Sequence, residues 1–192
     1  MTRHKLHRPR RIFIGIKLPE ELSDGIIGLQ SAFGELPGRF IPPEDIHLTL
    51  VPPFETRDLP YVKGTLRATL GRVRKFKLHF SQLSYGPDKE RPRLVWIECS
   101  ATKEIISLKK KLLKVFNKKE KIPFVPHMTI ARFKKADSEK VGHRPIQRPV
   151  QFSMNVESIE LFESPDRGGT GYKVLASVKL QPKDGVPLWH KS

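Results

Sequence analysis

Two short segments of this 192-residue chain carry the same arrangement of histidine and threonine. They are His47-Leu-Thr-Leu50 and His127-Met-Thr-Ile130, and their histidines are 80 positions apart. An unperturbed imidazole has a pKa of about 6.5, so near neutral pH one histidine of a pair can accept a proton while the other donates one. Such a pair suits a phosphodiester, because the base activates water and the acid protonates the leaving oxygen. The scheme requires no metal ion.

Each segment is expected to be a β-strand with its histidine and threonine on one face. Residues i and i+2 of a strand project from one side, and residues i+1 and i+3 from the other. The apolar residues Leu48, Leu50, Met128 and Ile130 are therefore expected to be buried. If the two polar faces meet across a cleft, the threonine hydroxyls can donate hydrogen bonds to non-bridging phosphate oxygens, where charge develops in the transition state.

The elements around these two strands follow an order that repeats along the chain. Hydrophobic periodicity and turn signals predict a strand at 11–17, a helix from 19 to about 34, the first histidine strand at 46–51, a helix at 58–73 and a strand at 76–85. After a turn come a strand at 93–98, a basic helix at 102–118, the second histidine strand at 127–133, a short helical segment at 137–141, and long strands at 150–162 and 172–180. Pro52 and Pro53 are expected to end the first histidine strand. The recurrence predicts an internal duplication.

Composition limits the class of protein and its partners. The formal net charge of +16 and the isoelectric point near 10.1 attract polyanions, so a nucleic acid is the first partner to consider. The longest apolar runs are only strand-sized, which predicts no membrane span, and no export signal is recognised at the N-terminus. The single cysteine, Cys99, lies in a strand-like run and is interpreted as a buried thiol in a reducing compartment. We therefore expect a cytoplasmic protein.

These motifs and the phrases around them resemble the two-histidine phosphoesterases, specifically the 2′-5′ RNA ligase (LigT-like), RNA 2′,3′-cyclic phosphodiesterase family. The resemblance covers residues 11–180 and includes Arg11-Ile-Phe-Ile-Gly-Ile, Ile46-His-Leu-Thr-Leu, Arg93-Leu-Val-Trp-Ile and Phe124-Val-Pro-His-Met-Thr-Ile-Ala-Arg132. It implies a bilobal α+β fold with an antiparallel sheet in each lobe, a pseudo-two-fold axis and a central cleft. Residues 11–180 would form this single domain, between a basic arm at 1–10 and a tail at 181–192.

The resemblance also implies an activity and a set of site residues. The activity is hydrolysis of RNA 2′,3′-cyclic phosphate ends to 2′-phosphates, with reversible 2′-5′ ligation and with no cofactor or metal. His47 is expected to be the acid and His127 the base, while Thr49, Thr129 and Arg132 would bind phosphate. Strict alternation places Arg132 on the face opposite His127, so this role requires a β-bulge or a strand end between them. The expected partner is RNA with a cyclic phosphate or a 2′-5′ linkage, including tRNA fragments, bound by a monomer.

Two alternative functions stay open. The same fold and histidines could serve another substrate, either a nucleotide cyclic phosphate or the 3′ end of a small RNA. The chain could instead be a non-catalytic RNA-binding module, although such a module has no need of two titratable groups at matched positions. The lysines from Lys109 to Lys121 fit either an RNA-binding stripe or a solvated helix face. Val51-Pro-Pro-Phe54 departs from the usual family phrase and leaves the local loop shape open.

Overall fold

The fold is described from a computed structural model, which covers residues 8–120, 122–138, 141, 146, 148–165 and 169–183. All structural statements below concern these residues. The strands are β1 (Arg10–Lys17), β2 (Gly38–Phe40), β3 (His47–Thr56), β4 (Phe76–Gly86), β5 (Leu94–Cys99), β6 (His127–Phe133), β7 (Arg148–Val156), β8 (Ser158–Glu163) and β9 (Lys173–Lys179). The α-helices are α1 (Ser23–Ser31), α2 (Leu59–Leu70) and α3 (Lys103–Val115), and 3-10 turns cover Glu20–Leu22, Pro43–Asp45 and Lys135–Asp137.

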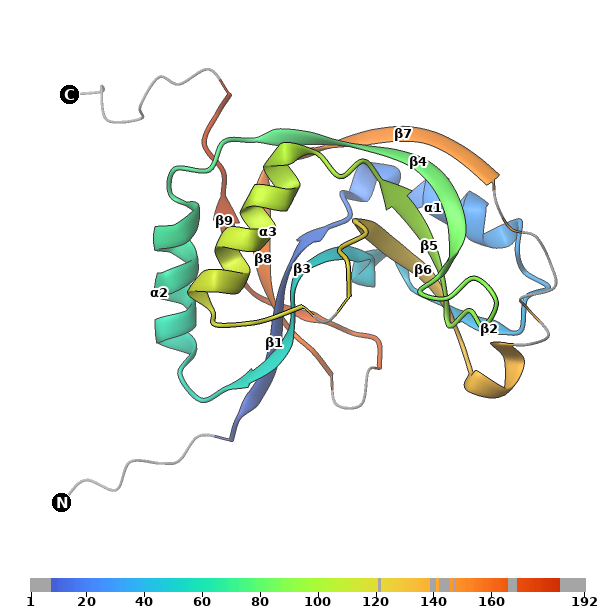
Figure 1. Ribbon diagram of the computed structural model, residues 1–192, viewed down its shortest axis with the longest axis horizontal. Helices are drawn as coiled ribbons and strands as arrows, with labels where there is room; N and C mark the ends of the chain where they lie inside the picture. Colours follow the sequence, from blue (N-terminus) through green and yellow to red (C-terminus); the bar gives the residue numbers. More distant parts are fainter. Residues whose placement is uncertain are drawn as a thin grey trace.

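The strands form one sheet in the order β7-β4-β5-β6-β3-β1-β8-β9, with β2 paired to β6 outside this path (Figure 1). All of these strands pair antiparallel to their neighbours. The α+β class and the antiparallel pairing expected from the sequence are therefore confirmed. No helix of the described chain is long and apolar enough to cross a membrane.

The sheet divides into two four-stranded halves that meet at its centre. The first half contains β3, β1, β8 and β9, and the second contains β6, β5, β4 and β7. The register pairs the central strands β3 and β6 at Leu48 and Met128, which hold the same place in their two motifs. In each half the histidine strand lies at the junction, and the next strand outward is β1 or β5. This symmetry places the two motifs side by side.

Each half of the sheet is built from segments that are distant in the chain. β4 follows α2 in sequence, yet it pairs with β5 and β7 in the second half, whereas β8 and β9 return to the first half beside β1 (Figure 1). The strand order is therefore not that of two consecutive lobes. Duplication of the chain itself stays a prediction.

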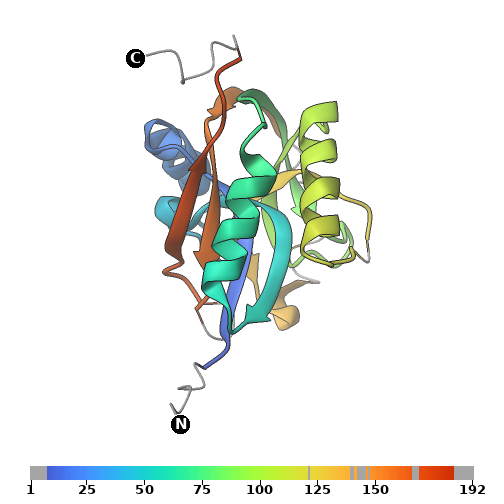
Figure 2. The ribbon, with the colours of Figure 1, turned by 90° about the vertical axis from the view of Figure 1, so that its left-hand side faces the viewer.

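The helices cover the strands and connect the halves. α2 and α3 pack against each other (Figure 2), and α3 also contacts β3 of the first half. α1 contacts β6 of the second half. The side chains of Leu48, Leu50, Met128 and Ile130 are fully buried, as their alternation predicts.

Two strand predictions were wrong in their extent. β3 continues to Thr56 through Pro52 and Pro53, because in this stretch it pairs only with β1, and a proline is tolerated where no ladder N–H is needed. A register shift marks the irregularity there.

The segment expected as one strand at 150–162 is two strands, β7 and β8, with Glu157 between them. β7 pairs with β4 and β8 pairs with β1, so the chain passes from one half of the sheet to the other at this residue. The short strand β2 was not predicted. Of the helical segment expected at 137–141, Asp137, Ser138 and Val141 are helical, and residues 139 and 140 lie outside the described residues. The first seven residues of the arm at 1–10 and tail residues 184–192 also lie outside them, and the domain boundaries stay a prediction.

Candidate active site

All five site residues predicted from the sequence line one narrow cavity at the junction of the two halves. The cavity has a volume of about 130 Å³ and is lined by His47, Thr49, His127, Thr129 and Arg132, together with Ile41, Asp45, Leu94 and Tyr172. His47 and His127 begin β3 and β6, so each imidazole stands at the strand end nearest the other motif. The arrangement assembles two titratable rings, two hydroxyls and one guanidinium.

The two imidazoles are held in the same way. Nδ1 of His47 lies 2.6 Å from the carbonyl oxygen of Asp45, and Nδ1 of His127 lies 2.7 Å from that of Val125. A carbonyl oxygen only accepts, so each Nδ1 must carry the hydrogen and donate it. This assignment leaves Nε2 of both rings to exchange protons with a ligand.

A β-bulge in β6 brings Arg132 into the cavity. Two consecutive residues of β5 pair with Thr129 and Ala131, so Ile130 is an extra residue in the ladder. Ile130 and Ala131 are both buried, and beyond them the alternation is shifted by one position. Arg132 consequently returns to the face of His127. The bulge that the sequence analysis required is confirmed.

The same irregularity occurs in β3. Consecutive residues of β1 pair with Thr49 and Val51, which leaves Leu50 as the extra residue. Leu50 and Val51 are both buried. The position that corresponds to Arg132 is Pro52, so only the second half supplies a cation from this place in its motif strand.

A buried side chain from the opposite half braces each bulge. Gln30 on α1 donates from Nε2 to the carbonyl oxygen of Ile130, at 3.0 Å, and to that of Ile41, at 2.7 Å. Lys109 on α3 donates from Nζ to the carbonyl oxygen of Leu50, at 3.1 Å. α1 follows a strand of the first half and α3 follows a strand of the second, so the two braces cross the junction. They tie each motif to the other half of the sheet.

Lys109 also holds the segment that leads into the second motif. Its Nζ lies 2.8 Å from Oε1 of Glu120 and 4.0 Å from the ring centroid of Phe124. Burial lowers the pKa of Lys109, and the hydrogen bond that its ammonium donates to Glu120 raises it in part. Lys111 likewise donates to the carbonyl oxygen of Thr69, at 2.8 Å. Lys109 is therefore a buried structural residue and fits neither interpretation of the lysine stripe, whereas Lys111 is exposed.

Burial controls the protonation of the histidines. It lowers the pKa of His47 to about 4, with a small further lowering by Arg132 and a partial offset by the Asp45 carbonyl. Burial also lowers the pKa of His127, where the Val125 carbonyl and the carboxylate of Glu98 act in the opposite direction. Both rings are therefore neutral at pH 7 when no anion is bound.

Asp45 is a site residue that the sequence analysis did not identify. Its buried carboxylate accepts from the backbone N–H groups of Gly171, at 2.6 Å, and Tyr172, at 2.9 Å. These bonds hold the Tyr172 ring edge-on to His47, with 4.9 Å between the ring centroids. Gly171 has φ of +87°, a conformation that glycine adopts without strain. No local pattern links Asp45 to a loop more than 120 positions away.

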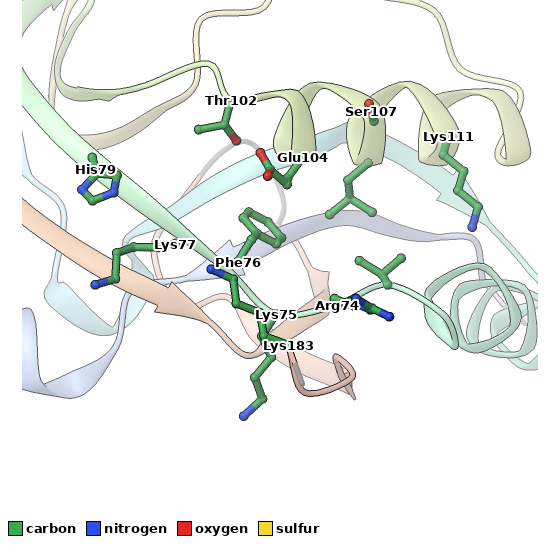
Figure 3. Close-up of a pocket in the computed structure, with 12 residues that line it drawn as sticks. Arg74, Lys75, Phe76, Lys77, His79, Thr102, Glu104, Ser107, Lys111 and Lys183 are labelled. Atoms are coloured by element: carbon green, nitrogen blue, oxygen red, sulfur yellow. The ribbon is translucent and has the colours of Figure 1, made fainter. Parts of the chain in front are cut away.

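A larger cavity, of about 610 Å³, lies between α3 and the start of β4 and contains none of the predicted site residues (Figure 3). Its rim is basic, but Lys77, Lys111 and Lys183 point away from one another (Figure 3). Lys75 is paired with Glu157 at 3.0 Å. His79 of β4 is exposed and lines this cavity. The basic side chains of this cavity therefore do not converge on one ligand position.

Cys99 is buried on β5, and burial raises the pKa of its thiol to about 12. This confirms the interpretation as a buried thiol. Among the described residues, no three His, Cys, Asp or Glu side chains are grouped as ligands for a metal ion.

Comparison with known proteins identifies relatives of the chain. Residues 20–168 match the family model described as the 2′-5′ RNA ligase superfamily. An RNA 2′,3′-cyclic phosphodiesterase of Bacillus subtilis (strain 168) is 26% identical over 160 residues, which are 79% of this chain and 86% of the relative. One of Aquifex aeolicus (strain VF5) is 29% identical over 114 residues, 55% of this chain and 60% of the relative. The crystal structure of E. coli LigT complexed with 3′-AMP superposes with a TM-score of 0.73 at 25% identity, covering 90% of this chain and 99% of LigT.

Proposed function

The chain belongs to the 2′-5′ RNA ligase superfamily, and on this basis we propose that it is an RNA 2′,3′-cyclic phosphodiesterase that opens the cyclic phosphate to a 2′-phosphate. The observation that carries the proposal is the shared cavity in which two anchored imidazoles, two threonines and an arginine converge. The names of the two bacterial relatives support the same reaction. No resident cofactor or metal takes part in the proposed steps.

In the proposed reaction, water attacks phosphorus while Nε2 of His127 accepts a proton from it. The bond between phosphorus and O3′ breaks, and O3′ takes a proton from Nε2 of His47, which leaves a 3′-hydroxyl and a 2′-phosphate. Thr49, Thr129 and Arg132 donate hydrogen bonds to the non-bridging oxygens, where negative charge develops. Because Nδ1 of each histidine is bonded to a carbonyl, both rings keep their orientation through the cycle.

The low pKa of His47 determines when this histidine carries the proton that it donates. With a pKa of about 4, His47 is neutral in the free protein, so in this assignment its proton arrives together with the anionic phosphate, which favours the imidazolium. One observation favours the reverse assignment. The carboxylate of Glu98, opposite His127 in the register, favours the charged form of that ring.

The same groups could carry out 2′-5′ ligation, in which the 5′-hydroxyl of a second RNA attacks phosphorus in place of water, O3′ leaves with a proton, and a 2′-5′ phosphodiester forms; this step is reversible. We propose that the protein acts in the cytoplasm, on RNA ends such as those of tRNA fragments, and as a monomer whose domain spans residues 11–180.

The second candidate substrate is a nucleotide cyclic phosphate. The structure of E. coli LigT with 3′-AMP supports it, because a mononucleotide is bound there.

The proposed function is tested by end analysis of a short RNA carrying a 2′,3′-cyclic phosphate, incubated with the protein in EDTA. Wild type should yield a 2′-phosphate, and His47→Ala and His127→Ala should each lower the rate by about 10² to 10⁴-fold. His79→Ala is the matched control, since His79 is an exposed histidine outside the cleft. Release of a 3′-phosphate, or unchanged rates in both cleft variants, contradicts the proposal. RNA binding without conversion would instead favour the binding-module alternative.

A further inference from the structure

A second cavity adjoins the catalytic cleft and shares one residue with it. The cavity has a volume of about 440 Å³, and its basic side chains are Arg39, Arg132 and Lys134. Arg132 also lines the catalytic cavity, so the two cavities border the same residue. The large cavity of Figure 3 has no lining residue in common with the cleft. The adjoining cavity is therefore the described space next to Arg132 on the side away from the two histidines.

The register places two arginines next to each other at this point. Arg39 of β2 is the direct antiparallel partner of Arg132 of β6. Neighbouring strands lie about 4.8 Å apart, so the two side chains start one strand spacing from each other. β2 pairs with the end of β6 that leads away from His127. The cationic groups thus follow a path from the catalytic phosphate position outward.

The catalytic cavity is smaller than the adjoining cavity, and this difference suits the end of an RNA chain. Pockets that enclose a small ligand have volumes of about 300–1,000 Å³, and the catalytic cavity of about 130 Å³ is below this range. It has room for a phosphate and part of a ribose, whereas the adjoining cavity falls within the range. An RNA substrate needs space for its next nucleotide, which a mononucleotide does not.

The residues that line the adjoining cavity suit a phosphate group. The lining carries three cationic residues and one acidic residue, Asp137, and guanidinium groups bind phosphate through paired hydrogen bonds. The Phe133 ring packs directly over Gly38, where an added Cβ atom would lie 2.8 Å from the ring. Glycine at this position therefore allows the close approach of β2 that forms the cavity.

We propose that this cavity binds the phosphate group joining the last two nucleotides of the RNA, through Arg39 and Lys134, and so makes the site prefer RNA ends over mononucleotides. The inference rests on the proposed function, because it names which substrate the same catalytic site takes. Arg132 would then contact the reacting phosphate on one side and border the neighbouring subsite on the other.

The test compares kcat/KM for adenosine 2′,3′-cyclic monophosphate with that for a five-nucleotide RNA ending in the same nucleotide. For the double variant Arg39→Gln and Lys134→Gln, the ratio of oligonucleotide to mononucleotide kcat/KM should fall about tenfold. The dependence of the oligonucleotide kcat/KM on salt should also become shallower, by about 0.7 in logarithmic slope for each lost phosphate contact. Arg39→Lys, which keeps the charge, should retain part of the preference.

Lys77→Gln is the matched control, because it removes one charge from an exposed lysine that lines the remote cavity. An unchanged ratio in the double variant overturns the inference, as does an equal fall with both substrates or the same fall in Lys77→Gln. A wild-type protein that opens the mononucleotide but not the RNA also overturns it. If wild type opens neither substrate, the proposed function itself has failed and the inference falls with it.

Discussion

The two halves of the sheet bring the same motif to one cleft, but they support its histidine with different side chains. In the first half, His47 packs on Phe13 with ring centroids 4.6 Å apart, and Phe162 of β8 stacks on Phe13 at 4.7 Å. In the second half, a single Trp96 of β5 lies against His127 at 4.1 Å. The position of each imidazole is common to both halves, whereas the apolar surface beneath it is not.

The residue that pairs with the motif threonine is small in the first half of the sheet and bulky in the second. Gly15 of β1 pairs with Thr49 as Trp96 of β5 pairs with Thr129. An added Cβ atom at Gly15 would lie 2.6 Å from the carbonyl oxygen of Leu48, so backbone fills the space there. Gly86 of β4, in contrast, leaves room for the Trp96 ring. The upstream carbonyl thus orients each imidazole in the same way, whereas the packing beneath the two rings differs.

The charged residue next to each histidine also differs between the two halves. The cross-strand neighbour of His47 is Lys17, and that of His127 is Glu98. Glu98 is held by the indole N–H of Trp96, at 3.0 Å. A pair of matched imidazoles becomes an acid and a base only when their surroundings differ, and this asymmetry provides that difference.

The largest expected effect tests which half supplies the acid. A cyclic phosphate with sulfur in place of O3′ has a leaving group that needs no protonation, so it should restore the activity of the acid variant alone. We expect the sulfur substrate to recover about 10² to 10⁴-fold of the rate lost in His47→Ala and to recover little in His127→Ala. The measurement is the single-turnover rate with both substrates. Recovery in His127→Ala instead would assign the acid to the second half.

A second prediction concerns stability in acid. The folded-state pKa of His47, about 4, lies below the unfolded value of 6.5, so the unfolded chain binds more protons and stability falls as the pH is lowered from 6.5 to 4. This single group should account for about 3 kcal/mol over that window. Urea unfolding of wild type and His47→Gln at pH 7 and pH 4 measures the difference. An equal loss of unfolding free energy in both proteins would refute the effect.

The prediction with the smallest expected effect compares the hydrogen bonds of Lys109 and Gln30 that brace the two bulges. Lys109→Met should lower the free energy of unfolding by about 2–3 kcal/mol, because it leaves the Leu50 carbonyl and the Glu120 carboxylate without this partner. Gln30→Leu should cost about 1 kcal/mol, since the Ile130 carbonyl keeps its bond from the Ile41 N–H, at 2.9 Å.

Denaturant unfolding of the two variants measures this difference, and Lys110→Met is the control on the exposed face of the same helix. Equal costs for the two brace variants would show that the halves are braced alike. A loss as large in Lys110→Met would point to the helix surface and not to the buried bond.

The sequence by itself determined the local features of this protein. Alternation with a period of two predicted the buried faces of both motif strands, because side chains of a strand alternate regardless of which strand lies beside it. It also predicted a bulge or strand end before Arg132, since the residue could reach the cleft by no other local route. The repeated His-x-Thr pattern indicated four residues, and the family resemblance added Arg132; the structure brings all five into one cavity.

The tertiary structure alone decided how the strands pair and what holds the motifs. The continuation of β3 past Pro53 depends on which edge of the strand is left without a partner, and the break at Glu157 depends on which half each strand joins. The roles of Asp45 and Lys109 arise from bonds to segments distant in the chain. Periodicity reports only the environment of neighbouring residues, so contacts of this kind become visible when the chain is folded.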